Sequence, residues 1–173
     1  AMKLCERAQG TKRKKFITTQ NAYHGKTHTS LSMTRSGHFR DGFIQGIPEE
    51  CVIEVPYGDI GVLERELEAN GSDVVAIIVE PIQGQGLDVP PKGYLSAVAD
   101  ICHKNNVLVI FDEIKTGASR CGTFCAFQDE DVVPDVVTLS KALSGGMRAF
   151  GVMITSEELF KKAYGKKKWS SLH

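Results

Sequence analysis

The stretch that decides the fold is Val107-Leu108-Val109-Ile110-Phe111-Asp112-Glu113, in which an apolar run leads straight into two carboxylates. A second run of the same kind, Val74-Val75-Ala76-Ile77-Ile78-Val79, ends at Glu80. Neither run alternates polar with apolar residues, and such strands are typical of a parallel sheet that helices cover on both faces. The two runs therefore predict an α/β fold, a three-layer sandwich with a mostly parallel sheet.

Short apolar runs alternate with amphipathic segments along the whole chain, as they do where helices join the strands of one sheet. The sequence has no internal repeat and no long linker, which favours one continuous domain. The expected strands are residues 15–19, 52–55, 74–80, 107–113, 136–139 and 150–155.

Helix signals stand between these strands. Asp59 is a capping residue ahead of Ile60, Leu63 and Leu67, which share one helical face, and Gly71 supplies the stop. Three further helical segments are expected: residues 1–4 as part of a helix, the region between Pro91 and Asn105, and a helix that starts at Thr155, which would form a capping box with Glu158. The basic tail Lys166–Lys168 is expected to be a solvated charge run.

The composition excludes several classes of protein. The 173 residues are 42% hydrophobic, and 21 basic side chains balance 21 acidic ones, so neither nucleic acid nor an anionic membrane is an expected partner. The longest apolar run is far shorter than the roughly 20 residues that span a bilayer, and no signal segment opens the sequence. The 5 cysteines are an odd number, typical of reduced intracellular thiols. We therefore expect a soluble, cytoplasmic protein.

A metal site is not expected from the spacing of potential ligands. Cys121 and Cys125 lack a second pair at ligand spacing. His24 and His28 stand four apart, but in a segment that the sequence predicts to be a loop rather than a helix, where this spacing would align the two rings.

Charged residues stand at the carboxyl ends of three predicted strands: Glu80 and Asp112 within the last two positions of two strands, and Lys141 two residues after the strand 136–139. In open α/β sheets ligands collect at the carboxyl ends of the strands. A charge buried there is costly without a partner. One interpretation is a structural salt bridge between Asp112 and Lys141 at the edge of the sheet, and the other is a ligand site.

Four motifs in a fixed order carry a resemblance to a known family: Asn21–Thr27 (NAYHGKT), Glu80–Gly84 (EPIQG), Asp112–Arg120 (DEIKTGASR) and Ser140–Gly146 (SKALSGG). Their order and the 29 positions (141 − 112) from Asp112 to Lys141 resemble the class III pyridoxal-phosphate (PLP) aminotransferases of the acetylornithine, ornithine and 4-aminobutyrate aminotransferase type. The resemblance implies the large-domain fold of fold type I and PLP as cofactor. It also implies transamination between a small-molecule amino donor and a 2-oxo acid or aldehyde.

The same resemblance implies a role for individual residues. Lys141 would be the catalytic residue, which forms the internal aldimine with PLP and moves the proton between the substrate α-carbon and the cofactor. Asp112 would pair with the pyridine nitrogen and keep it protonated. Tyr23 would stack on one face of the ring. His24 either is a structural residue hydrogen-bonded to backbone or touches the cofactor.

The chain departs from the family pattern at several positions. Lys115 stands where many members have a glutamine that hydrogen-bonds the PLP hydroxyl, and it is either a cofactor contact or a solvated surface lysine. Lys26 stands where some members have an arginine for a substrate carboxylate, and it is the candidate substrate-binding residue. Gln85 replaces a glutamate, and Ser119 replaces a glycine. The complete set of cofactor-binding candidates is Tyr23, His24, Glu80, Asp112, Lys115 and Lys141.

The resemblance further implies that residues 1–173 are the central portion of the PLP-binding large domain. We expect the phosphate-binding turn to fall before Ala1 and the C-terminal small domain after His173, the full-length protein to be a homodimer, and the isolated chain to be weakly active or inactive. Two alternatives stay open: an aminomutase or epimerase on the same scaffold, and a truncated non-catalytic domain that pairs with a homologue. A nucleotide-binding module is not favoured, because neither Gly-x-Gly-x-x-Gly nor a P-loop occurs.

Overall fold

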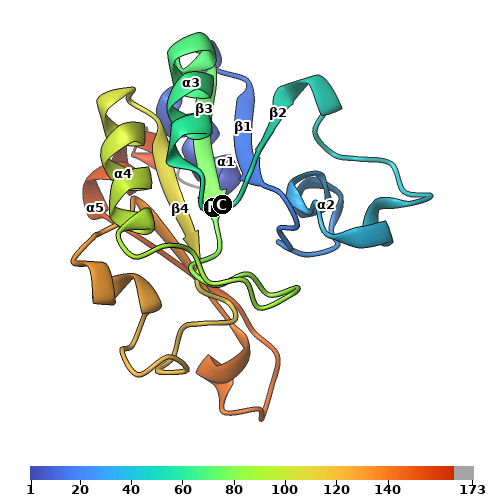
Figure 1. The fold of residues 1–173 in the computed structure, drawn as a ribbon, viewed down its shortest axis with the longest axis vertical. Coiled ribbons are helices and arrows are strands. Elements are labelled where there is room, and N and C mark those ends of the chain that lie inside the picture. The colour runs from blue at the N-terminus through green and yellow to red at the C-terminus, as the bar shows by residue number, and fades with distance from the viewer. Residues whose placement is uncertain (166–173) are drawn as a thin grey trace.

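The computed structural model describes residues 1–165. Their strands form one six-stranded sheet in the order β2-β1-β3-β4-β5-β6 (Figure 1). Neighbouring strands run parallel except for β6, which is antiparallel to β5. The predicted strands are all present, with some shorter bounds. The strand predicted as 74–80 ends at Val79, the one predicted as 107–113 covers Leu108–Asp112, and the last begins at Val152 instead of residue 150 because it pairs with the short β5. The strands are β1 (Lys15–Thr19), β2 (Val52–Val55), β3 (Val74–Val79), β4 (Leu108–Asp112), β5 (Val136–Leu139) and β6 (Val152–Thr155).

Helices cover both faces of the sheet, which confirms the predicted three-layer fold (Figure 1). Val109 and Phe111 of β4 pack on one face against α3 (Ile60–Asn70) and α4 (Tyr94–Lys104). Ile110 points to the other face, where α1 (Met2–Gln9) and α5 (Glu157–Tyr164) pack against each other and against the sheet. Side chains buried on both faces explain why these strands lack polar alternation.

The predicted caps are correct for one helix and wrong for another. The Asp59 carboxylate accepts the backbone N–H of Val62 at 3.0 Å, so α3 begins where the sequence predicts. The last helix was predicted to begin at Thr155, but Thr155 is the final residue of β6, and its hydroxyl donates to the Asp135 carbonyl. Ser156 is the N-cap instead, and its side chain accepts the N–H of Leu159. The Thr155–Glu158 capping box is therefore not formed.

Short helical segments between β1 and β2 were not predicted. The segment from His28 was expected to be a loop, but it forms α2 (His28–Met33). A 3-10 turn, η1 (Gly37–Arg40), follows it, and η2 (Glu49–Cys51) precedes β2. Two further 3-10 turns, η3 (Ala126–Glu130) and η4 (Lys141–Ser144), flank β5. Elements of three to six residues are too short to give a readable hydrophobic period.

The carboxyl ends of the parallel strands meet at one edge of the sheet (Figure 1). The loops that follow β1, β3, β4 and β5 therefore lie near one another, and they carry the motifs that the sequence singled out. Across the described range, none of the helices has the length and apolar character that crossing a membrane requires. The tail Lys166–Lys168, predicted to be a solvated charge run, lies outside the described residues.

Candidate functional site

A cavity of about 390 Å³ lies at this edge of the sheet and brings together all the site residues that the sequence singled out. Its walls come from the loop after β1, from η1, and from the ends of β3, β4 and β5. Arg120, from the third motif, does not line it. The lining residues are Tyr23, His24, Gly25, Lys26, Phe39, Glu80, Gly84, Gln85, Asp112, Ile114, Lys115 and Lys141.

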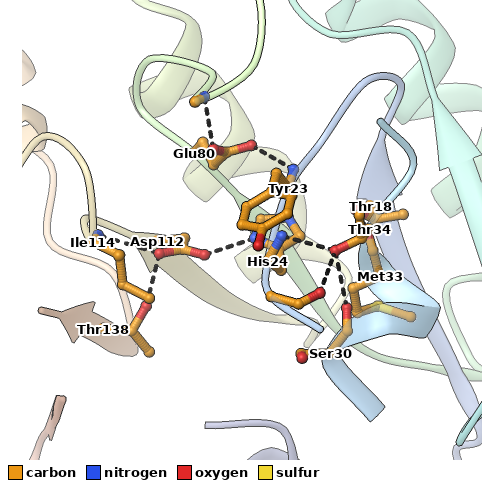
Figure 2. A network of polar contacts seen from close by, with 12 residues as sticks. Thr18, Tyr23, His24, Ser30, Met33, Thr34, Glu80, Asp112, Ile114 and Thr138 are labelled. Atoms are coloured by element: carbon orange, nitrogen blue, oxygen red, sulfur yellow. Dashed lines mark hydrogen bonds and ion pairs between the residues drawn. The ribbon is translucent and has the colours of Figure 1, made fainter. Parts of the chain in front are cut away.

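Asp112 is the last residue of β4, and its carboxylate is 5% exposed at the floor of the cavity. Oδ2 lies 2.7 Å from Nδ1 of His24, and Oδ1 accepts the N–H of Ile114 and the hydroxyl of Thr138, each at 3.2 Å (Figure 2). The structural ion pair with Lys141 that the sequence left open is not formed. The carboxylate is instead oriented by three donors, so its position does not depend on the lysine.

His24 is buried beside Asp112, and its backbone N–H donates to the Thr34 hydroxyl at 3.0 Å (Figure 2). Because a carboxylate only accepts hydrogen bonds, Nδ1 carries the proton that it donates to Asp112. Nε2 is buried and has no hydrogen-bond partner within the described residues. The ring is thus bound to a carboxylate rather than to backbone, a partner that the sequence did not predict.

Glu80 anchors the loop that carries Tyr23 by a hydrogen bond. Its carboxylate, 4% exposed, accepts the backbone N–H of Tyr23 at 2.9 Å and that of Gly84 at 2.8 Å (Figure 2). Burial raises the pKa of this carboxyl above its ordinary value, while the nearby His24 and the two N–H donors oppose the rise. Glu80 therefore joins the ends of β1 and β3 at the cavity, and the Tyr23 ring lines the wall.

Three lysines line the cavity, Lys26, Lys115 and Lys141, and the last two come from the segments that follow β4 and β5. The Lys115 ammonium donates to the Gly84 carbonyl at 2.7 Å, so Lys115 lines the cavity and also fastens the turn after β3. Lys141 is the first residue of η4 and has a φ of +45°, a left-handed backbone conformation that residues other than glycine rarely adopt. Such backbone strain persists where the surrounding structure holds it, and it clusters at functional sites.

Phe39 lines the cavity but was missed from the sequence. It lies in η1, outside every motif and every amphipathic period, so no local pattern pointed to it. A second finding concerns Ser119, which stands where the family pattern has a glycine. Its φ is +65°, so a serine takes the left-handed conformation that a glycine adopts more easily.

The fold and the site together define the class of PLP-dependent transferases of fold type I. The chain belongs to the aminotransferase class III family, whose family model matches residues 1–166.

Comparisons with individual proteins agree with this assignment. The chain is 39% identical over 160 residues to the acetylornithine aminotransferase of Methanopyrus kandleri, covering 92% of this chain and 39% of that protein. The structure of the ornithine aminotransferase from Toxoplasma gondii, which has PLP at partial occupancy at its active site, has a TM-score of 0.83 at 32% sequence identity. The match covers 92% of this chain and 38% of the ornithine aminotransferase chain. The structure of a transaminase from the marine bacterium Virgibacillus has a TM-score of 0.85 at 25% sequence identity. The match covers 99% of this chain and 41% of the transaminase chain. The chain thus spans about two fifths of the length of these relatives.

Membership of this family implies PLP as the cofactor, and the residues of the cavity fit such a group. The volume of about 390 Å³ lies within the range of roughly 300–1,000 Å³ that is typical of small-molecule sites. The donor set also fits, because the walls supply a lysine amine for an aldehyde, a carboxylate for a pyridinium nitrogen, and an aromatic ring for stacking.

Proposed function

We propose that the protein catalyses transamination between an amino donor and a 2-oxo acid or aldehyde, and that the Lys141 amine binds the cofactor covalently at its aldehyde. One observation carries the proposal: the amine-bearing side chain of Lys141, the Asp112 carboxylate and the Tyr23 ring line the same cavity. These residues come from three separate parts of the chain, so chemistry requiring all three is possible only in the folded chain. The resident cofactor, when bound, accepts the electron pair of the substrate carbanion into its ring.

Each residue has a distinct task in this proposal. Nζ of Lys141 would hold the cofactor at its aldehyde and, as a free amine, would move a proton from the substrate α-carbon to the cofactor. The Asp112 carboxylate accepts a hydrogen bond from the protonated pyridine nitrogen and keeps that proton in place. His24 keeps Oδ2 of Asp112 oriented, because it donates to that oxygen from a buried position. Tyr23 holds the plane of the cofactor ring by stacking.

Two further lysines complete the proposed site. Lys115 has two N–H donors left after its bond to Gly84, and one of these is available for the cofactor hydroxyl. Lys26 forms no ion pair within residues 1–165, and its side chain lines the cavity. We therefore assign Lys26 to the substrate carboxylate, which a point charge holds without the bidentate fork of an arginine.

We also propose that the active form is a homodimer. Large apolar side chains stay exposed in the segments that follow η1 and η4 in the sequence, where Ile44 is 83% and Met147 is 93% exposed. Large exposed apolar side chains are typical of a protein–protein interface. Sedimentation equilibrium should give twice the chain mass, and Ile44→Asp should shift the protein to the monomer; a monomeric parent protein would refute this part of the proposal.

Two assignments concern the context of the chain. We propose that residues 1–173 correspond to the central portion of the PLP-binding large domain, which agrees with the 39% of the Methanopyrus kandleri protein that they span. We also propose that the protein acts in the reducing cytoplasm, and the five free cysteines support this assignment. Cell fractionation of the tagged protein tests the second assignment, and recovery outside the cytosol would refute it.

The absorbance spectrum of the protein with PLP, before and after borohydride, tests the catalytic proposal. We expect a band at the violet edge of the visible range that borohydride removes, and that Lys141→Ala lacks. Lys104→Ala, an exposed lysine at the end of α4, is the matched control and should keep the band. A band retained by Lys141→Ala would refute the role of Lys141. Racemisation of an amino acid without amino transfer would identify an epimerase instead.

A further inference from the structure

Phe39 brings a second aromatic ring to the cavity from a separate turn. It lies in η1, which begins at Gly37 with a φ of +54°, a conformation that glycine adopts without a steric penalty. The next residue, Arg40, forms an ion pair with Glu49, which stands just ahead of β2. The ion pair therefore anchors the C-terminal end of the turn, and the half-buried Phe39 ring lies against Tyr23, a residue of the first motif.

The Phe39 ring contacts the Tyr23 ring edge-to-face. Their centroids lie 5.2 Å apart with an angle of 69° between the planes, the edge-to-face arrangement that aromatic quadrupoles favour. The backbone of Tyr23 is anchored by Glu80, but its hydroxyl has no hydrogen-bond partner within residues 1–165. The position of the Tyr23 ring around its own side-chain torsions therefore depends on Phe39.

The same ring holds the ammonium of Lys26. Nζ lies 4.6 Å from the centroid of Phe39, within the range of a cation–π contact. Such a contact restrains the ammonium at the cavity wall without neutralising it, because a ring carries no net charge. The charge of Lys26 thus stays available for an anion, while its position is fixed before that anion arrives.

We propose that Phe39 is a positioning residue that couples the two halves of the site: its edge contact aligns the Tyr23 ring for the cofactor, and its face holds Lys26 for a substrate carboxylate. This inference rests on the proposed function, since it gives Tyr23 and Lys26 their tasks. It predicts that one substitution disturbs the cofactor signal and carboxylate binding together, although Phe39 itself reacts with neither. It also predicts that the effect on carboxylate binding passes entirely through Lys26.

The test combines two measurements on the protein loaded with PLP: circular dichroism of the cofactor band, and calorimetry with glutarate as a carboxylate probe. Phe39→Leu should reduce the ellipticity of the band and weaken glutarate binding about two- to fivefold, the range expected for loss of a partly exposed cation–π contact. Phe39→Tyr, which keeps an aromatic ring, should leave both the ellipticity and the glutarate affinity at the values of the parent protein. Phe124→Leu, an exposed phenylalanine that does not line this cavity, is the control and should change neither.

A double-mutant cycle separates positioning from a general structural effect. In a Lys26→Met background, Phe39→Leu should have no further effect on glutarate binding. The same two- to fivefold loss in that background would overturn the inference, and so would an unchanged band together with unchanged glutarate binding. A parent protein that shows no cofactor band would refute the proposed function itself, whereas a normal parent band with an unaffected Phe39→Leu protein would refute this inference alone.

Discussion

Nδ1 of His24 lies 2.7 Å from Oδ2 of Asp112, although 88 positions separate the two residues in the sequence. His24 follows β1 and Asp112 ends β4, and β3 lies between these strands in the sheet. Both side chains are at least nine-tenths buried, so the pair is shielded from water. The contact exists only when the strands are in register, and it links the formation of the sheet to the geometry of the site.

Replacing His24 should therefore cost far more than replacing a histidine in an exposed pair. His24→Leu leaves Oδ2 of the buried Asp112 carboxylate without its hydrogen-bond donor, while Ile114 and Thr138 still donate to Oδ1, and we expect a loss of about 3 kcal/mol in the free energy of unfolding. His103 lies 3.0 Å from Asp135 but is 47% exposed, so His103→Leu should cost less than about 1 kcal/mol. Urea unfolding of the two variants checks this difference. Equal losses would mean that burial adds nothing to the His24–Asp112 contact.

Much of the sheet was predictable from the sequence because its signals are local. The continuous apolar runs around Ile77 and Ile110 identify strands buried on both faces without any knowledge of their neighbours. The cap at Thr155 was wrong because two adjacent hydroxyl residues, Thr155 and Ser156, both satisfy the local rule. The length of β6, and so the choice between them, is set by its pairing with β5.

The composition of the site was predictable only as far as its motifs reach. Asp112 and Lys141 stand in motifs, and the structure brings both to one cavity. The partner of Asp112 was not predictable, because two residues at the same edge, Lys141 and His24, could each have satisfied it, and the choice depends on the three-dimensional arrangement of the loops. Phe39 was missed for the same reason, since a 3-10 turn has no period to mark the ring that reaches the cavity.

Removing the charge of Asp112 should impair catalysis more than removing one of its hydrogen bonds. Asp112→Asn keeps the size of the side chain but cannot stabilise a protonated pyridine, and we expect kcat to fall by about 100-fold or more. Thr138→Val removes the hydroxyl that donates to Oδ1 and should lower kcat by less than about tenfold, in line with one neutral hydrogen bond. Steady-state kinetics with one donor and one acceptor compare the two. Similar losses would contradict the assignment of Asp112 to the pyridine nitrogen.

Gly84 should not accept a side chain without a loss of stability, because Glu80 and Lys115 pack closely around it. The Glu80 carboxylate accepts its N–H, and the Lys115 ammonium donates to its carbonyl. A Cβ at this position would lie 2.9 Å from Oε1 of Glu80 and 3.6 Å from Cδ of Lys115. Gly84→Ala should therefore displace one of these side chains and destabilise the protein by about 1–3 kcal/mol, the usual cost of overpacking. Gly61→Ala, inside α3 and without a close contact, should stabilise it by about 0.5–1 kcal/mol. Thermal unfolding followed by circular dichroism measures both, and a stabilising Gly84→Ala would show that the turn is loosely held.

Glu80 should make the stability of the protein fall as the pH rises through the mildly acidic range. Burial raises the pKa of this carboxyl above the ordinary value of 4.5. Between the ordinary and the raised pKa the folded chain keeps a proton that the unfolded chain has released, so raising the pH through this window favours unfolding.

Glu80→Gln cannot ionise, and its free energy of unfolding should lack this part of the slope. Urea unfolding at a series of pH values measures the slope, with Glu68→Gln, an exposed residue of α3, as the control that should keep the slope of the parent protein. If Glu80→Gln keeps that slope as well, the carboxyl has the same proton affinity in the folded and unfolded chains, and the two N–H donors from Tyr23 and Gly84 offset the whole cost of its burial.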